Sequence, residues 1–176
     1  MSVISLLIIF NLVQFDCDIL RKSGKLKIEA LKEIILKLPR AKTSTNDSIL
    51  VIVLPEYLTF SEYKNNIEIS FIYTFYGLKN KKFKEISFGP FQMQLGFIDK
   101  YLKICNKNNL HDSSLIEYNT TDYKILIDHL EELNKIEFQW EMLKTFCEYN
   151  FKNLPKNLSD LKKLNALMRV YNSGTV

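Results

Sequence analysis

Apolar residues recur along most of this chain at the three- and four-residue spacing of α-helices. The first such stretch, residues 26–38, stops before Pro39, whose backbone has no N–H group for the next helical turn. Residues 49–54 form a continuous stretch of Ile, Leu and Val, which fits a buried strand as well as a helix. We interpret it as a helix capped by Asn46 or Asp47 at the end of a polar link.

Further helices are expected in the rest of the chain. The apolar spacing predicts them over residues 61–76, 91–102, 122–150 and 161–171. The apolar positions of the first of these are Ile67, Phe71, Ile72, Phe75 and Tyr76. The lysine-rich segment 79–84 and the polar segment 105–121 predict loops, and Pro155 separates the last two helical regions.

The composition supports one mainly α domain. The chain has 176 residues, of which 47% are apolar and 25% charged, and this balance excludes intrinsic disorder. It lacks the roughly 18 consecutive apolar residues that a membrane-spanning helix needs. With 5 Gly and 4 Pro, it suits long helices better than a turn-rich β-sandwich. We expect a single helical domain over residues 21–176.

Residues 1–20 fit two interpretations. The apolar run 4–10 has the length of a signal-peptide core, but no basic residue precedes it and no small-x-small cleavage site follows. Phe15 and Asp16 before Cys17 also make a poor lipoprotein site. A signal peptide predicts a periplasmic or secreted protein, whereas an N-terminal helix of the fold predicts a cytoplasmic one.

The cysteines and histidines predict no metal site. Cys17, Cys105, Cys147, His111 and His129 show no close ligand spacing, and the chain has no Gly-rich phosphate loop. We therefore expect neither a metal nor an organic cofactor. Cys105 and Cys147 would remain as a pair if the N-terminal segment were removed, but we favour two buried thiols over a disulfide.

The positive charge is spread along the chain. The net charge of +4 would favour approach to an anionic polymer such as a cell wall or a nucleic acid. The densest basic cluster consists of Lys79, Lys81, Lys82 and Lys84 around Phe83. We interpret it as a solvated loop and expect no nucleic-acid partner.

Three ordered motifs carry the functional signal. They are Pro55-Glu56 after the apolar run 49–54, Ser87-Phe88-Gly89-Pro90-Phe91-Gln92-Met93-Gln94, and Tyr171-Asn172-Ser173-Gly174. They resemble the motifs of lytic transglycosylases and goose-type lysozymes, in which a helix ends in the catalytic Glu, a Gly-x-x-Gln element forms the cleft floor, and a Tyr-Asn-x-Gly element lies on a later helix. The second motif is also similar to that of lysozyme-like proteins in Bacteroidetes.

The resemblance implies a lysozyme-like helical domain with a substrate cleft, and a monomer that cleaves peptidoglycan glycan strands without a cofactor. Glu56 takes the role of the catalytic acid and base. Its surroundings in the sequence suit an acid with a raised pKa, because six aliphatic residues and Pro55 precede it, Tyr57 follows it, and the next basic residue is Lys64. The resemblance leaves open lysozyme-type hydrolysis and lytic transglycosylase chemistry.

Glu68 is the rival acid. The segment Ile67-Glu68-Ile69-Ser70 is closer to the Glu-Ser pair of the transglycosylase motif, but Glu68 lies inside a helical pattern. A lysozyme-type enzyme needs a second carboxylate about 5 Å from the acid, or about 6.5–9.5 Å away if it inverts the sugar. By position, the candidates are Glu62, Glu68 and Glu85. By resemblance, substrate-binding or orienting roles fall to Gln92, Tyr171, Asn172, Ser87 and Gly89.

The departures from the family pattern keep other functions open. Pro55-Glu56-Tyr57 replaces Glu-Ser, and the chain ends two residues after Gly174, where such enzymes continue. A C-terminally truncated enzyme and an inactive protein therefore both stay open. One alternative is a non-catalytic lysozyme-like module that binds glycan or protein, with a cleft that lacks a buried carboxylate. Another is a helical interaction protein with a large exposed apolar patch.

Overall fold

The computed structural model describes residues 22–31, 33–34, 43–108, 122–155 and 157–173. The chain divides into two compact units, Met1–Pro39 and Arg40–Val176. In the first unit, residues 22–31 and 33–34 are helical, which agrees with the helical pattern of residues 26–38. The prediction for residues 1–20 lies outside the described part of the chain.

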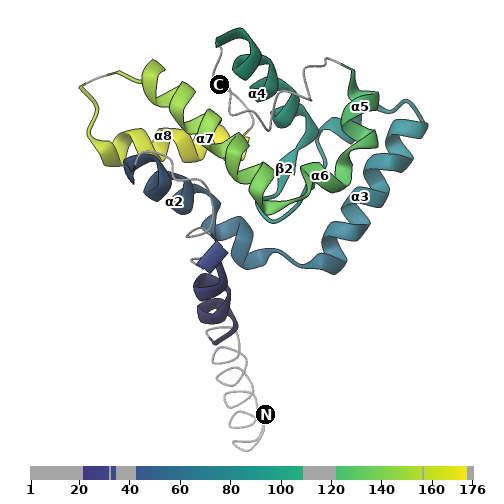
Figure 1. The fold of residues 1–176 in the computed structure, drawn as a ribbon, viewed down its shortest axis with the longest axis horizontal. Helices are drawn as coiled ribbons and strands as arrows, with labels where there is room; N and C mark the ends of the chain where they lie inside the picture. Colours follow the sequence, from purple (N-terminus) through teal and green to yellow (C-terminus); the bar gives the residue numbers. More distant parts are fainter. Residues whose placement is uncertain (1–21, 32, 35–42, 109–121, 156, 174–176) are drawn as a thin grey trace, which may run out of the picture. The chain divides into compact units, whose positions relative to one another are not determined.

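The second unit is mainly α, as the sequence predicts (Figure 1). Its elements are α2 (Thr43–Thr59), α3 (Glu62–Gly77), the 3-10 helix η1 (Lys81–Lys84), β1 (Ser87–Phe88), β2 (Met93–Gln94), α4 (Leu95–Asn108), α5 (Tyr123–Asp128), α6 (Leu130–Leu133), α7 (Ile136–Asn153) and α8 (Asp160–Ser173). The two strands pair antiparallel, with Ser87 opposite Gln94 and Phe88 opposite Met93. None of the helices described is both long and apolar enough to cross a bilayer.

Helix α2 resolves the ambiguous apolar run 49–54. Its buried residues Ile49, Ile52 and Val53 follow the three- and four-residue spacing of a helix that packs one face inward. The helix starts at Thr43, so the prediction that Asn46 or Asp47 caps it is wrong. The helix extends over the polar residues 43–48 that precede the run. Packing of the apolar face fixes the direction of the helix but not the residue at which it starts.

The last turn of α2 carries the candidate acid. Pro55 lies inside the helix, which continues to Thr59, so Glu56 is in the final turn and not at the end. The Thr59 hydroxyl donates to the backbone oxygens of Pro55 (3.3 Å) and Glu56 (3.0 Å), which satisfies carbonyls that the helix end leaves free.

Helix α3 follows the predicted apolar positions only in part. Ser61 caps it as expected for a helix that begins there, with its side chain accepting from Lys64 N at 3.2 Å. Of the predicted positions, Ile72 is buried, whereas Ile67 and Phe71 are 39% and 50% exposed. The polar Asn65 is buried as well, and its amide group hydrogen-bonds to Gly89 and Asn134.

The segment between α3 and α4 differs most from the prediction. Lys81–Lys84 forms a 3-10 helix where a loop is predicted, and the Asn80 side chain caps it by accepting from Lys82 N at 3.0 Å. The helix predicted from Phe91 begins instead at Leu95, after the β1–β2 hairpin. It then continues to Asn108, beyond its predicted end, and residues 109–121 of the predicted loop lie outside the described residues.

The core of the second unit surrounds α7. Helices α2, α4 and α8 all pack against α7 (Figure 1), which buries Trp140, Leu143 and Phe146. Asp122 opens the region before α7 as predicted, since its side chain accepts from Lys124 N at 2.8 Å. From there to Asn153 the chain forms three helices, α5, α6 and α7, where the apolar pattern predicts one long or two shorter ones.

The two described cysteines are buried free thiols, as we favoured over a disulfide. Cys105 and Cys147 both lie in the core without a disulfide bond. Burial raises the pKa of Cys105, and it raises the pKa of Cys147 to about 12.

Candidate active site

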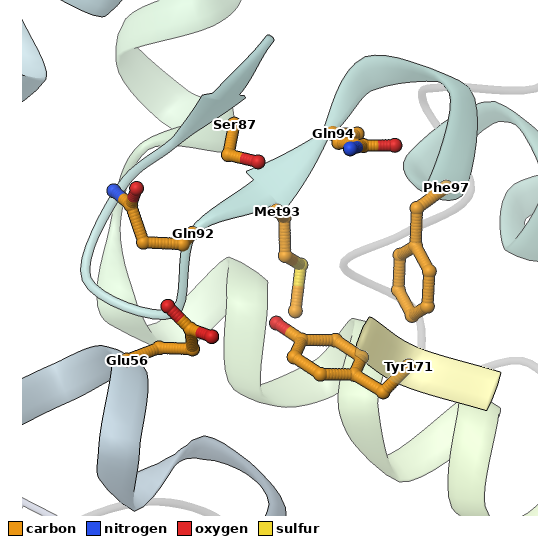
Figure 2. Close-up of a pocket in the computed structure, with 7 residues that line it drawn as sticks. All are labelled: Glu56, Ser87, Gln92, Met93, Gln94, Phe97 and Tyr171. Atoms are coloured by element: carbon orange, nitrogen blue, oxygen red, sulfur yellow. The ribbon is translucent and has the colours of Figure 1, made fainter. Parts of the chain in front are cut away.

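A pocket of about 160 Å³ lies where the last turn of α2 meets the hairpin and helices α4 and α8 (Figure 2). Its lining residues are Glu56, Ser87, Gln92, Met93, Gln94, Phe97 and Tyr171. Each of the three sequence motifs contributes to this set. The structure therefore brings together four predicted site residues, namely Glu56, Ser87, Gln92 and Tyr171.

The remaining predicted site residues lie around this pocket without lining it. Gly89 is in the hairpin turn, and Glu68 on α3 accepts a hydrogen bond from Gln92. Asn172 lies in α8, but its side chain is outside the described residues. Glu62, a candidate second carboxylate, is exposed at the start of α3.

The hairpin turn that carries Gln92 is held by buried side chains. The Gly89 N–H donates to Asn65 Oδ1 at 2.6 Å, and the Phe91 N–H donates to Gln139 Oε1 at 3.0 Å. Gln139 Nε2 donates in turn to the Phe88 carbonyl at 3.1 Å. Backbone groups in a buried turn need such partners, so these amides fix its conformation.

Asn65 and Gln139 support the turn that carries Gln92, and the sequence analysis identified neither. Asn65 is itself oriented by Asn134, whose Oδ1 accepts from Asn65 Nδ2 at 3.1 Å. A sequence signal existed for Asn65, because it lies seven residues before the buried Ile72 and thus on the same helical face. Gln139 carries no comparable signal, because its role depends on residues about 50 positions away.

Gln92 adopts the left-handed backbone conformation that favours glycine, with φ of +52°. Its amide binds α3: Lys64 Nζ donates to Oε1 at 3.3 Å, and Nε2 donates to Glu68 Oε2 at 3.2 Å. Nε2 also donates to the Gly89 carbonyl at 3.1 Å. The side-chain bonds to Lys64 and Glu68 help to offset the cost of the backbone conformation.

Glu56 and Tyr171 meet on the other side of the pocket. Figure 2 shows the half-buried Glu56 carboxylate directed toward the hairpin turn and the Tyr171 hydroxyl. Burial raises the pKa of the Tyr171 phenol above its usual range, and the negative charge of Glu56 raises it further. The phenol therefore stays protonated and donates to the Phe91 carbonyl. Tyr57 also contacts Phe91, with ring centroids 6.2 Å apart.

The pocket offers one carboxylate among neutral groups. Ser87 and Gln94 add a hydroxyl and an amide, while Met93 and Phe97 add apolar surface. Over the residues that the structure describes, no three His, Cys, Asp or Glu side chains gather as a metal site would require. The arrangement suits proton transfer by Glu56 beside a substrate held by polar and apolar contacts.

Comparison of this chain with protein-family models, with curated proteins and with solved structures finds no match.

Proposed function

We propose that this chain is a lysozyme-like, peptidoglycan-cleaving enzyme in which Glu56 is the general acid and base. The observation that carries the proposal is the pocket, which joins Glu56 to Gln92 and Tyr171 from three segments far apart in the chain. These are the residues for which the resemblance to lytic transglycosylases and goose-type lysozymes implies a shared site.

The chemistry needs one carboxyl group that changes its protonation state. Protonated Glu56 donates its proton to the oxygen of the glycosidic bond as the bond between that oxygen and the sugar carbon breaks. The resulting carboxylate then takes a proton from the hydroxyl that attacks the same carbon. If this hydroxyl belongs to the sugar itself, the product is an anhydro sugar; if it belongs to water, the product is a hydrolysed strand.

We favour the transglycosylase reaction, because Glu56 is the one carboxylate among the described residues that lines this pocket. Glu68, which is 15% exposed, is bound to Gln92 and pairs with Lys64 at 3.4 Å. Those contacts suit a positioning residue that holds the hairpin turn against α3. A half-buried carboxylate in the pocket also favours an enzyme over a non-catalytic glycan-binding module.

The size of the pocket suits one part of a long substrate. Its volume of about 160 Å³ is below the roughly 300–1,000 Å³ of sites that enclose a whole small molecule. A single sugar of a polymer can enter, with its faces against Phe97 and Met93, while the rest of the strand lies along the surface. We propose that the protein acts as a monomer outside the cytoplasmic membrane, where peptidoglycan lies.

The test is the release of muropeptides from purified peptidoglycan, with products analysed by mass spectrometry. We expect the parent protein to release products with anhydro ends and Glu56→Gln to release none. Glu131→Gln is the matched control, because it makes the same change at an exposed position on α6. Equal release by parent and Glu56→Gln, or no release by a folded parent, would overturn the proposal.

A further inference from the structure

A second pocket of about 190 Å³ adjoins the candidate active site. It is lined by Lys84, Glu85, Gln94, Gly96, Phe97, Lys100, Tyr101 and Val170. Gln94 and Phe97 line both pockets, so these two side chains border both cavities. Figure 2 shows the Phe97 ring beside Tyr171, and the two rings meet edge to face with centroids 5.4 Å apart. A ligand in the first pocket that extended past Phe97 would approach the residues that line the second.

The second pocket has a positive charge that the first lacks. Lys84 and Lys100 each contribute an ammonium group, and Glu85 contributes the single carboxylate of the lining. In the part of the chain that the structure describes, neither lysine forms an ion pair. No carboxylate of the described residues therefore neutralises either ammonium group in an ion pair.

Lys84 is held in place at the pocket. Its Nζ lies 3.8 Å from the centroid of the Tyr123 ring and 5.8 Å from that of Phe83, in cation–π geometry. Tyr123 is anchored in turn, since its hydroxyl donates to the buried Asp99 at 3.1 Å. A half-buried lysine with a fixed position loses less conformational entropy when it binds an anion than a free surface lysine does.

The two pockets differ in charge. No basic side chain lines the first pocket, whereas Lys84 and Lys100 give the second a net positive lining. Coulomb interactions would therefore attract an anionic group to the second pocket. A strand that carries a carboxylate beside a neutral glycosidic bond would be oriented in one direction across Phe97.

We propose that the second pocket binds a carboxylate-bearing substituent on the sugar next to the bond that Glu56 attacks. This inference rests on the proposed function and narrows its substrate class. Alternate sugars of peptidoglycan carry a lactyl ether that ends in a carboxylate or in an acidic peptide, whereas neutral acetamido-sugar polymers carry none. The second pocket thus selects acidic glycan strands over neutral ones and sets the direction in which they bind.

The experiment measures binding, so that it does not depend on turnover. The full chain with Glu56→Gln, which blocks cleavage, is titrated with a peptidoglycan tetrasaccharide that carries free lactyl carboxylates and with the same tetrasaccharide after the carboxylates are converted to methyl amides. We expect the acidic form to bind at least threefold more tightly at low salt, with the preference shrinking at about 0.5 M salt.

The lysines are tested by paired substitutions with equal loss of charge. Lys84→Gln with Lys100→Gln should remove the preference for the acidic form, whereas Lys81→Gln with Lys82→Gln should keep it, because those exposed lysines do not line the pocket. Lys100→Gln alone should reduce the preference for the acidic form. Because Lys100 is exposed, this variant can still be interpreted if the loss of Lys84 disturbs the packing of Tyr123.

Each result decides between the inference and the proposed function. Equal binding of the two tetrasaccharides, or an equal loss in both double variants, would overturn the inference and leave the role of Glu56 intact. If a folded protein binds neither form, the proposed function falls and the inference falls with it.

Discussion

The side chain of Gln139 fills the space that any side chain at position 89 would need. A Cβ atom on Gly89 would lie 2.0 Å from Nε2 and 2.6 Å from Cδ of Gln139, and Gly89 has φ of +77°. Gln139 also binds the backbone of Phe88 and Phe91 on both sides of this turn. The turn that carries Gln92 therefore depends on a glycine and a buried amide together.

Replacing Gly89 with alanine should destabilise the protein strongly. Both the positive φ and the overlap with Gln139 oppose a Cβ atom, so we expect a loss of about 2–4 kcal/mol in the free energy of unfolding. Urea denaturation measures it. Gly77→Ala is the control, because a Cβ there meets nothing within 4 Å, and its effect should stay below about 1 kcal/mol. Equal effects of the two substitutions would contradict this account of the turn.

Replacing Gln139 with leucine should also destabilise the fold, because it removes the hydrogen bonds of the amide. Leucine is chosen because it is close to glutamine in size. The Phe91 N–H and the Phe88 carbonyl would lose their buried partner, which costs roughly 2–4 kcal/mol for two unsatisfied groups. Asn153→Ala on the same helix removes one exposed hydrogen bond to Tyr149 and should cost much less. A stable Gln139→Leu protein would show that the turn does not need this amide.

The helices were predictable where one apolar face packs against α7. Ile49, Ile52 and Val53 are buried at helical spacing, and that spacing is a property of the local sequence. The joint placement of Glu56 and Gln92 came from ordered motifs, since helical periodicity says nothing about which distant segments meet. The expectation that these residues share a site therefore came from the resemblance and not from the apolar pattern.

The hairpin was not predictable, for a physical reason. Phe91, Leu95 and Ile98 continue a helical spacing, so the pattern favours a helix from position 91. The structure breaks that helix at Gln92, whose left-handed conformation is supported by hydrogen bonds to Lys64 and Glu68, residues 28 and 24 positions away. Contacts of this range override local preference and leave no periodic signal.

The hydroxyl of Tyr171 should stabilise the hairpin through the Phe91 carbonyl. Tyr171→Phe removes this buried donor without changing the ring, so we expect a loss of about 1–3 kcal/mol in the free energy of unfolding and lower muropeptide release. Tyr73→Phe is the matched control, because Tyr73 is 46% exposed. If both variants unfold at the same urea concentration, the Tyr171 bond has no structural role.

The stability of the protein should fall above about pH 9. Burial raises the pKa of Cys147 from its usual value of 9.0 to about 12, and burial, with the nearby Asp99, raises that of Tyr123 from 10.0 to about 12. Above pH 9 the unfolded chain loses these protons while the folded protein keeps them. The stabilisation is complete below pH 9 and is lost as the pH rises toward 12, by up to about 1.4 kcal/mol per pH unit for the buried Cys147 and by less for Tyr123, which is partly exposed to solvent.

Urea denaturation between pH 8 and 10.5 tests this dependence. Cys147→Ala should reduce the slope above pH 9, although it also lowers stability at every pH by leaving space in the core. The comparison therefore uses the change with pH and not the absolute stability. A parent protein whose stability is constant or increases over this interval would contradict the burial of the Cys147 thiol.

Substitution of the two rival glutamates should separate proton transfer from positioning. In Glu68→Gln the ion pair with Lys64 is lost, but the new amide oxygen can still accept from Gln92 Nε2, so kcat should fall by no more than about tenfold. In Glu56→Gln the proposed proton donor is lost, and kcat should fall by roughly 10²–10⁴. Both are measured by muropeptide release.

Glu68→Leu extends the comparison, because it also removes the acceptor for Gln92. A positioning role predicts that this variant is less active than Glu68→Gln and has a lower melting temperature, since the hairpin loses a link to α3. A catalytic role for Glu68 predicts instead that Glu68→Gln and Glu68→Leu are equally inactive with unchanged melting temperature. That result, together with an active Glu56→Gln protein, would show that the catalytic acid is Glu68 on α3 and not Glu56 on α2.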